Sequence, residues 1–381
     1  MKNKYVNRKL DIKSVLEEKS CFLFGPRQSG KSSLVAHTLE DVHHFDLLSG
    51  STFMRLSSNP AYIEETCTDG KPVVIDEIQK LPALLDEVHR LIEAKGMTFL
   101  LTGSSARKLR RQGVNLLGGR ARVRKLHPFS ASELGDDFDL DRALNYGLVP
   151  GIWFGKNPDE DLSDYINEYL QQEIMAEGAT RNLPAYSRFL EVAALCSGEQ
   201  IDYSGISRDA KVPRTTVQEY FRILDETMLA CEVPVWKGGK GRKTVETSKF
   251  YMFDTGVARR LTGRNAMTAG TAEYGHAFEG WIHHELRSYL DFRRRDGVIA
   301  YWRTQSGTEV DFVVDDVAIE AKCKTEVGND DLKGLKAIAG EGPFRARIVV
   351  SREPVPRCRD GIEILPWKDF IDRLWNGEIV K

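Results

Sequence analysis

Residues 25–32 read Gly25-Pro26-Arg27-Gln28-Ser29-Gly30-Lys31-Ser32, which matches the pattern G-x-x-x-x-G-K-[ST]. A short apolar run at 21–24 predicts a buried strand before it, and residues 33–39 predict a helix after it. This is the order that a phosphate-binding P-loop requires. We therefore expect these eight residues and Ser33 to contact a nucleotide, with Lys31 at the β- and γ-phosphates and Ser32 on Mg²⁺.

The composition is that of an ordinary globular protein of two or three domains. The chain has 381 residues, 41% hydrophobic and 29% charged, with a net charge of -2. No apolar run approaches the ~18 residues that a membrane span needs, and no apolar stretch follows the first residues as in a signal peptide. The six cysteines are scattered without a C-x-x-C pair. This pattern argues against a zinc site or a disulfide framework and predicts a cytoplasmic protein.

A second apolar strand, at 73–75, ends in Asp76 and Glu77, as a Walker B element does. Asp76 would hold the Mg²⁺ shell, and Glu77 would polarise the attacking water. Residues 98–105 predict a further strand that ends in hydroxyl side chains. Thr102 or Ser104 could orient the water at the γ-phosphate, or Ser104 or Ser105 could cap the next helix, and the sequence leaves both roles open.

Between residues 107 and 125 the chain has eight basic residues and no acidic one. Such a run is usually a solvated face, but the missing counter-charges also suit a phosphate partner. Arg120 follows two glycines and precedes a predicted strand at 121–126. That position suits an arginine that stabilises γ-phosphate charge in the site of a neighbouring subunit. The eight are Arg107, Lys108, Arg110, Arg111, Arg120, Arg122, Arg124 and Lys125.

With these motifs the chain resembles the AAA+ ATPases. More narrowly, it resembles a bacterial and archaeal group whose ATPase domain precedes a domain of unknown function with a nuclease-like core. The resemblance implies a five-stranded P-loop sheet, ATP with Mg²⁺, and a ring-like homo-oligomer with arginine fingers acting in trans. It gives Lys31, Ser32, Asp76, Glu77, Thr102 and Arg120 the roles described above.

The middle region, 136–262, begins with helical patterns at 161–177 and 186–196, which predict a helical lid. Helices at 206–210 and 214–228 around Lys211-Val212-Pro213 predict a helix–turn–helix, followed by strands at 230–236 and 249–253 around a basic glycine loop. This is a winged-helix pattern. Its second helix should bury one face and expose polar side chains that could enter a DNA major groove, although a packing role between subunits would need the same architecture. The exposed residues would be Arg214, Thr215, Gln218 and Arg222.

In the last region, 263–381, strands at 308–314 and 317–322 predict a β-hairpin symmetric about Asp315-Asp316. That symmetry sets Asp311 opposite Glu320 and Glu309 opposite Lys322. Strict alternation would place the apolar side chains on one face and these four charged side chains on the other. Facing carboxylates repel each other unless a cation lies between them. The apolar set is Val310, Phe312, Val314, Val317, Ile319 and Ala321.

Glu279 falls on the apolar stripe of a helix predicted at 275–292, so it needs a buried partner such as a metal. Glu279, Asp311 and Glu320-Ala321-Lys322 together resemble the PD-(D/E)XK nuclease pattern. The resemblance implies that the three acids bind Mg²⁺ for phosphodiester hydrolysis, with Lys322 orienting water or stabilising the leaving oxygen. The competing interpretation is an exposed hairpin face with a weak Glu309–Lys322 salt bridge.

We therefore predict an α/β protein with a P-loop AAA+ domain at 1–135, a helical lid and winged-helix segment at 136–262, and an α/β nuclease-like domain at 263–381. The first functional hypothesis is Mg²⁺-dependent ATP hydrolysis coupled to binding, remodelling or cleavage of duplex or branched DNA. The alternative is an ATP-dependent switch or assembly module that binds a protein partner, with an inactive nuclease-like domain.

Overall fold

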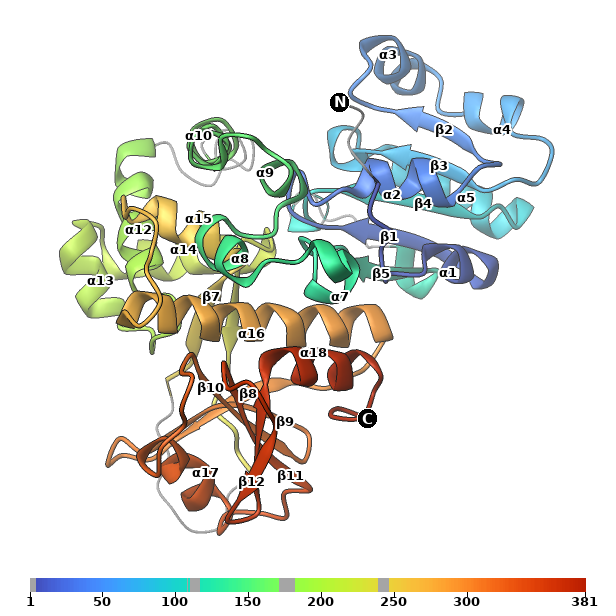
Figure 1. Ribbon diagram of the computed structural model, residues 1–381. Coiled ribbons are helices and arrows are strands. Elements are labelled where there is room, and N and C mark those ends of the chain that lie inside the picture. The colour runs from blue at the N-terminus through green and yellow to red at the C-terminus, as the bar shows by residue number, and fades with distance from the viewer. Residues whose placement is uncertain (1–4, 108, 110–116, 171–181, 239–246) are drawn as a thin grey trace. The chain divides into compact units, whose positions relative to one another are not determined.

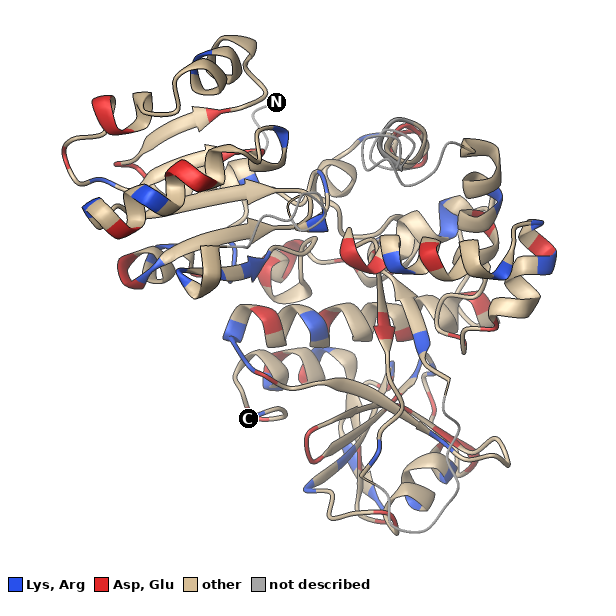
Figure 2. Ribbon diagram, turned by 180° about the vertical axis from the view of Figure 1, so that it is seen from behind, with Lys and Arg blue, Asp and Glu red and all other residues tan. Residues whose placement is uncertain are grey.

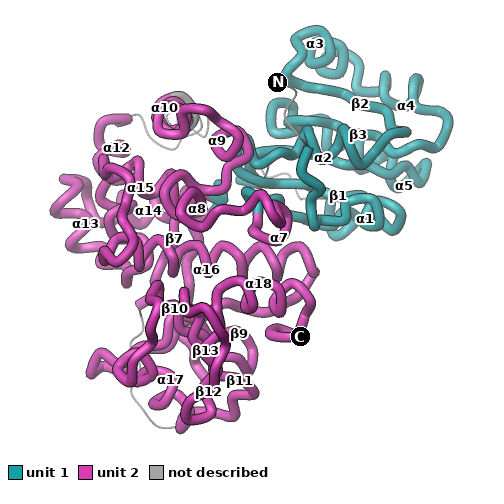
Figure 3. The backbone as a smooth tube through the Cα atoms, viewed as in Figure 1, with its two compact units in different colours: residues 1–129, 226–228 teal, residues 130–225, 229–381 magenta. Residues whose placement is uncertain are grey.

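The computed structural model describes residues 5–107, 109, 117–170, 182–238 and 247–381, with the side chains of 168–170 left out. It divides into two compact units, shown in Figure 3. Unit 1 comprises residues 1–129 and 226–228, and unit 2 comprises 130–225 and 229–381. The regions predicted as a middle and a last domain therefore belong to one compact unit.

Unit 1 is built on a five-stranded sheet in the order β2-β3-β4-β1-β5, with every pair of neighbours parallel (Figure 1). The three inner strands are buried along their whole length, which is why they appear in the sequence as unbroken apolar runs. The sheet confirms the predicted α/β class. The strands are β1 (Ser20–Phe24), β2 (His43–Asp46), β3 (Val73–Asp76), β4 (Phe99–Gly103) and β5 (Ala121–Lys125).

Helices complete the core of unit 1. The clearest is α5, which buries Leu84, Val88 and Leu91 at helical spacing, in the same apolar cluster as Phe22 and Ile75 of the sheet. The helices are α1 (Ile12–Glu18), α2 (Lys31–Thr38), α3 (Gly50–Ser58), α4 (Tyr62–Thr66), α5 (Leu84–Lys95), and the 3₁₀ helices η1 (Ile78–Lys80) and η2 (Leu117–Gly119).

The first part of unit 2 is helical and contains the predicted helix–turn–helix, α13 and α14, followed by the antiparallel pair β6–β7. The helix predicted at 161–177 is described as far as 170, and 171–177 lie outside the described residues. The elements are α7 (Ala131–Leu134), η3 (Gly135–Asp137), α8 (Leu140–Tyr146), α9 (Pro150–Trp153), α10 (Pro158–Asp164), the π-helix η4 (Tyr165–Leu170), α12 (Leu183–Leu195), α13 (Tyr203–Ala210), α14 (Arg214–Glu226), β6 (Ala230–Val233), β7 (Lys249–Met252) and α15 (Thr255–Leu261).

The second part of unit 2 is a six-stranded mixed sheet in the order β12-β13-β11-β10-β9-β8, with the long helix α16 preceding it in the chain. The elements are α16 (Ala272–Arg293), β8 (Ile299–Arg303), β9 (Glu309–Val314), β10 (Val317–Lys322), η5 (Asp330–Leu332), α17 (Lys333–Ile338), β11 (Ala346–Ser351), β12 (Arg357–Arg359), β13 (Ile362–Pro366) and α18 (Trp367–Trp375).

The β9–β10 hairpin has the predicted register, with Val317 opposite Val314 and Ile319 opposite Phe312. The prediction of two strictly alternating faces is wrong. A bulge in the β8–β9 pairing sets two residues of β9, 311 and 312, against one of β8, and this reverses the side-chain alternation. Val310 and Val313 consequently share a cluster with Ala318, while the Phe312 ring lies against Tyr251 and His283.

The segment after β6 ties the helical part of unit 2 to the sheet. Trp236 N donates to the Tyr301 carbonyl of β8 at 2.7 Å, and Tyr301 N donates to the Pro234 carbonyl at 3.0 Å. The Trp236 ring packs against Phe344 in the same unit. Lys249 of β7 is buried and contacts Glu309 at the start of β9, so β7 lies near the open end of the β9–β10 hairpin.

Acidic and basic residues are interspersed along the ribbons of both units, in keeping with the small net charge (Figure 2). In the part of the chain that the structure describes, no helix is both long and apolar enough to cross a membrane.

Candidate functional site

The P-loop connects the end of β1 to the start of α2. Gly30 has φ 94°, a left-handed conformation that glycine adopts without strain. A Cβ on Gly25 would collide with the Leu126 carbonyl oxygen, so the loop needs glycine there as well. Lys31 is buried, and its Nζ donates to the carbonyl oxygens of Gly25 (2.8 Å) and Pro26 (3.1 Å). The loop thus holds its lysine inside the turn, where a P-loop lysine meets phosphate.

The start of α2 and the carboxyl ends of β3 and β4 bring the predicted Mg²⁺ and water-orienting residues together. Ser32 Oγ donates to Asp76 Oδ2 at 3.0 Å, and Thr102 Oγ1 donates to Asp76 Oδ1. Glu77 N donates to Thr102 Oγ1 at 3.3 Å. These contacts arise because β1, β3 and β4 are parallel neighbours whose carboxyl ends lie at one edge of the sheet.

The loop residues fit a nucleotide and its metal. The Ser29 side chain is 1% exposed, and its Oγ has no hydrogen-bond partner among the described residues. Pro26 is buried, Arg27 is half-buried, and Gln28, Ser32 and Ser33 are exposed. A hydroxyl and a carboxylate are hard oxygen donors of the kind that Mg²⁺ prefers, and bound Mg²⁺ would neutralise phosphate charge. Ser32 and Asp76 would hold it.

Glu77 has an unusual backbone conformation with φ 62°, immediately before η1. Burial raises the pKa of its carboxyl, and the positive charge of Lys31 opposes that rise. A carboxylate with raised basicity suits the predicted role in polarising water. Gln79, on η1, donates its side-chain amide to Glu77 Oε2.

Three residues of the basic run pair with acids from elsewhere in the chain, which corrects the expectation that the run lacks counter-charges. Arg120 pairs with Glu93 of α5, Arg122 pairs with Glu18 of α1, and Arg107 pairs with Glu226. Acids remote in the sequence are close in the fold. Lys108, Arg110 and Arg111 lie outside the described residues. Arg120 is 38% exposed and stands just before β5.

Arg8 was not predicted as part of this site. Its Nη1 donates to the Ser29 carbonyl and its Nη2 to the His127 carbonyl, both at 2.6 Å. The guanidinium therefore fixes the P-loop backbone from outside. No sequence pattern marks it, because it lies well before β1 and outside the motif.

In unit 2, six charged residues form what we call the acid–lysine cluster. Lys322 Nζ lies 2.6 Å from Glu320 Oε1 and 4.0 Å from Asp311 Oδ2, and Asp311 Oδ2 also accepts from Ala321 N at 2.8 Å. Glu320 Oε2 is buried without a hydrogen-bond partner among the described residues. The members are Lys249, Glu279, Glu309, Asp311, Glu320 and Lys322.

Lys249 and Tyr251 of β7 complete this cluster and were missed from the sequence. Lys249 Nζ contacts Glu309 and lies 3.4 Å from Glu279 Oε1, which also accepts from the Tyr251 hydroxyl at 2.5 Å. The predicted Glu309–Lys322 pair is not the one that forms, because Glu309 pairs with Lys249 and Arg303. Lys249 and Tyr251 were missed because they precede Glu279 in the chain and belong to no metal-binding or nuclease motif.

The electrostatics of the cluster follow from burial. Burial and the nearby Asp311 raise the pKa of Glu279 to about 7, against the opposing effect of Lys249. Burial and Asp311 likewise raise the pKa of Glu320. Burial lowers the pKa of Lys322, but Asp311 and Glu320 outweigh that effect and hold its pKa above the ordinary value.

The cluster does not present a ready-made metal site. Across the described residues, no three His, Cys, Asp or Glu side chains converge as a group that could hold a metal ion. The charges of Glu279, Asp311 and Glu320 are instead compensated by two lysines. Their assignment to Mg²⁺ therefore stays a prediction.

The outer face of α14 has the predicted character. Val217, Tyr220, Phe221 and Leu224 are buried, whereas Arg214, Thr215, Gln218 and Arg222 are exposed. Of the basic glycine loop, residues 239–246 lie outside the described residues.

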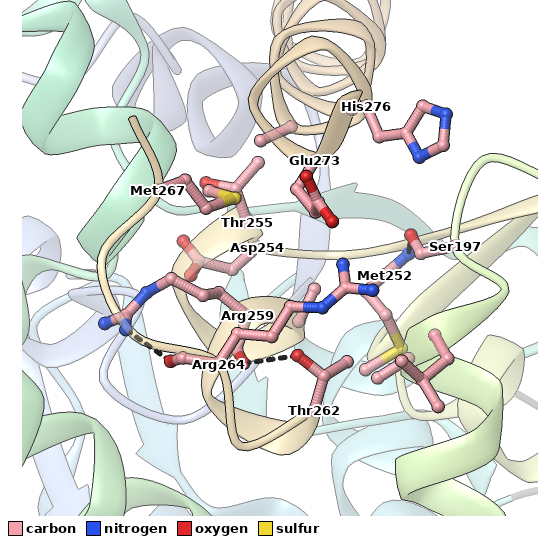
Figure 4. Close-up of a pocket in the computed structure, with 15 residues that line it drawn as sticks. Ser197, Met252, Asp254, Thr255, Arg259, Thr262, Arg264, Met267, Glu273 and His276 are labelled. Atoms are coloured by element: carbon pink, nitrogen blue, oxygen red, sulfur yellow. Dashed lines mark hydrogen bonds between the residues drawn. The ribbon is translucent and has the colours of Figure 1, made fainter. Parts of the chain in front are cut away.

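A pocket of about 60 Å³ lies among α12, α15 and α16 (Figure 4). Two of its charged side chains already have structural roles: Asp254 accepts from Leu148 N and Val257 N, and Arg259 donates to the Asn145 and Arg264 carbonyls. None of the site residues predicted from the sequence lines it.

Comparisons with known families match three successive stretches of the chain. Residues 17–135 match the family described as AAA domain, 137–268 match a domain of unknown function, DUF8612, and 274–370 match another, DUF4143. Residues 17–135 form an AAA-type ATPase domain. The AAA domain contains the whole P-loop, β3 and β4, and the domain matched at 274–370 contains the acids and Lys322 of the cluster.

Two curated relatives are uncharacterized proteins of Mycobacterium tuberculosis and Mycobacterium bovis. Each is 25% identical over 302 residues, covering 77% of this chain and 67% of the relative. Among solved structures, a Signal Transduction ATPase with Numerous Domains (STAND) protein with a tetratricopeptide repeat sensor from Pyrococcus horikoshii is 14% identical, with a TM-score of 0.26. That match covers 77% of this chain and 48% of the solved chain, so this chain spans about half its length.

Proposed function

We propose that the protein hydrolyses ATP with Mg²⁺ at the P-loop and couples turnover to DNA binding by unit 2. The observation that carries the ATPase part is the hydrogen-bonded series Ser32–Asp76–Thr102 beside a P-loop that encloses Lys31. These side chains come from the start of α2, the end of β3 and β4. They supply a hydroxyl and a carboxylate for Mg²⁺, a lysine for phosphate, and Glu77 for water.

DNA binding is proposed for the face of α14 and the β6–β7 wing. Arg214 and Arg222 are exposed there with polar Thr215 and Gln218, side chains that contact phosphates and base edges. Arg222 pairs with Glu219 one turn away at an exposed position, and such a pair is weak enough to exchange for a phosphate. A ring-like homo-oligomer, with Arg120 completing the neighbouring site, and a cytoplasmic location are parts of the same proposal.

The second candidate is an ATP-dependent switch that binds a protein partner, with an inactive nuclease-like domain. The observation that favours it is the compensation of the acid–lysine cluster by Lys249 and Lys322. A nuclease would need these acids for metal, whereas a structural cluster would keep its internal ion pairs.

One assay separates the two candidates. ATP hydrolysis is measured with and without linear, forked and four-way DNA, and strand cuts are scored in the same tubes with Mg²⁺ or Mn²⁺. The first candidate predicts turnover stimulated by DNA and an affinity that falls steeply with salt. Cuts that disappear in Asp311→Ala while ATP hydrolysis persists would assign cleavage to the cluster. Neither stimulation nor cuts on any DNA would favour the switch.

A further inference from the structure

Gln79 lies between the end of β3 and the end of β4, and no role was predicted for it from the sequence. It lies on η1, two residues after Glu77, and only 9% of it is exposed. Its Nε2 donates to Glu77 Oε2 and lies 3.5 Å from Ser104 Oγ of the segment after β4. The left-handed backbone of Glu77 makes this possible, because it turns the chain into η1 at once.

The oxygen atom of the same amide, Gln79 Oε1, also has a defined environment. Gln79 Oε1 is buried without a hydrogen-bond partner among the described residues. It rests against Gly103, the last residue of β4, where a Cβ would collide with it. A buried amide oxygen without a partner destabilises the folded state, so an apolar side chain would be more stable here if the role of Gln79 were only structural.

We propose that Gln79 is a positioning residue for Glu77 in ATP hydrolysis. Its amide N–H holds one oxygen of the Glu77 carboxylate, which leaves the other oxygen free to meet the attacking water. The inference rests on the proposed ATPase function and adds to it the residue that orients the base.

Gln79 would support the hydrolytic step of ATP turnover. The water oxygen forms a bond to the γ-phosphorus, and the bond from that phosphorus to the β–γ bridging oxygen breaks, so ADP leaves with the electron pair. Glu77 takes the water proton and returns it to the phosphate product. Gln79 makes no bond to substrate, and its effect passes through the orientation of the Glu77 carboxylate.

The test variant is Gln79→Met, which keeps the side-chain volume and removes both polar atoms. We expect kcat for ATP to fall at least about ten-fold while KM stays within about two-fold, since the P-loop contacts remain. Thermal stability should hold or rise, because the unpaired oxygen is gone. The exposed neighbour substitution Lys80→Ala is the matched control and should leave both constants unchanged.

A double-variant experiment distinguishes positioning from a structural role. In a Glu77→Gln background, Gln79→Met should cause no additional loss of kcat, because the group that it orients is absent.

The results distinguish a failure of this inference from a failure of the proposed function. Equal losses in the two backgrounds, a rise in KM with unchanged kcat, or no loss would overturn the inference while leaving the ATPase assignment intact. If Gln79→Met does not fold, Gln79→Ala is measured by the same criteria. Absence of turnover in the unaltered protein would instead overturn the proposed function, and this inference with it.

Discussion

Lys31 is the side chain whose removal tests the nucleotide site most directly. It is the cation that the loop encloses, and it would meet the phosphate charge of ATP. For Lys31→Ala we expect kcat/KM for ATP to fall at least about 100-fold, measured by phosphate release. Lys13→Ala, an exposed lysine on α1, serves as the control. Hydrolysis that is unchanged in Lys31→Ala would contradict the site assignment.

Lys249 tests whether the acid–lysine cluster is held together by its own ion pairs. It is 3% exposed and pairs with Glu279 and Glu309. Among the described residues, Lys249→Met therefore leaves Glu279 without its cationic partner and leaves Glu309 paired with Arg303 alone. We expect a loss of about 3–5 kcal/mol in the free energy of unfolding, measured by urea titration. Adding Glu279→Gln should restore part of it, because one unpaired charge is removed. Equal stability of the single variant and the unaltered protein would refute the pairing.

At the scale of secondary-structure elements, Glu285 holds three helices of unit 2 together. It lies on α16 and is fully buried; it accepts from Ala131 N of α7 at 2.7 Å and from the indole N–H groups of Trp281 and Trp375, each at 3.1 Å. In Glu285→Ala these donors lose their acceptor. We expect the free energy of unfolding to fall by at least about 3 kcal/mol, measured by tryptophan fluorescence during urea unfolding.

Glu285 should also make the stability of the protein depend on pH. Burial raises its pKa to about 7 despite those three hydrogen bonds. Between the ordinary carboxyl range and pH 7, the unfolded chain releases a proton that the folded chain retains, so stability falls as pH rises through this window. Glu285→Gln cannot ionise and should flatten that fall, at a cost of about 1 kcal/mol for one weakened hydrogen bond. If the free energy of unfolding depended on pH identically in both proteins, this prediction would be wrong.

The elements show where sequence patterns succeed. β1, β3 and β4 are buried on both faces, so each appears as an apolar run and was predicted. β2 (His43–Asp46) was missed because this edge strand is only partly buried and has no apolar pattern. The bulge at 311 and 312 was missed for a different reason. It depends on the pairing with β8, which the hairpin's own sequence does not contain.

The same distinction holds for the candidate sites. Ser32, Asp76 and Thr102 each follow a recognisable strand or loop, so their meeting could be predicted from the order of a parallel sheet. Lys249 and Arg8 reach their sites through tertiary contacts and carry no local pattern. The acids that neutralise Arg120 and Arg122 escaped prediction for that reason too.

At the scale of the whole molecule, the proposed oligomer can be tested through Arg120. Its pair with Glu93 is exposed, so it contributes little to stability, and the guanidinium can be redirected to a neighbouring subunit's phosphate. Arg120→Ala should lower kcat while sparing ATP binding, whereas Arg122→Ala, an arginine with a similar exposed acid partner, should leave kcat unchanged.

Mixing variants decides whether Arg120 acts between subunits. Lys31→Ala and Arg120→Ala proteins are each expected to be nearly inactive alone. Combined in one ring, an Arg120→Ala subunit still offers an intact P-loop, and a neighbouring Lys31→Ala subunit still offers Arg120. Random mixing should therefore restore about a quarter of the sites, since both conditions must be met at one interface. Phosphate release that stays at the level of the separate variants would place the action of Arg120 within its own chain, because only a shared site can be rebuilt from two damaged subunits.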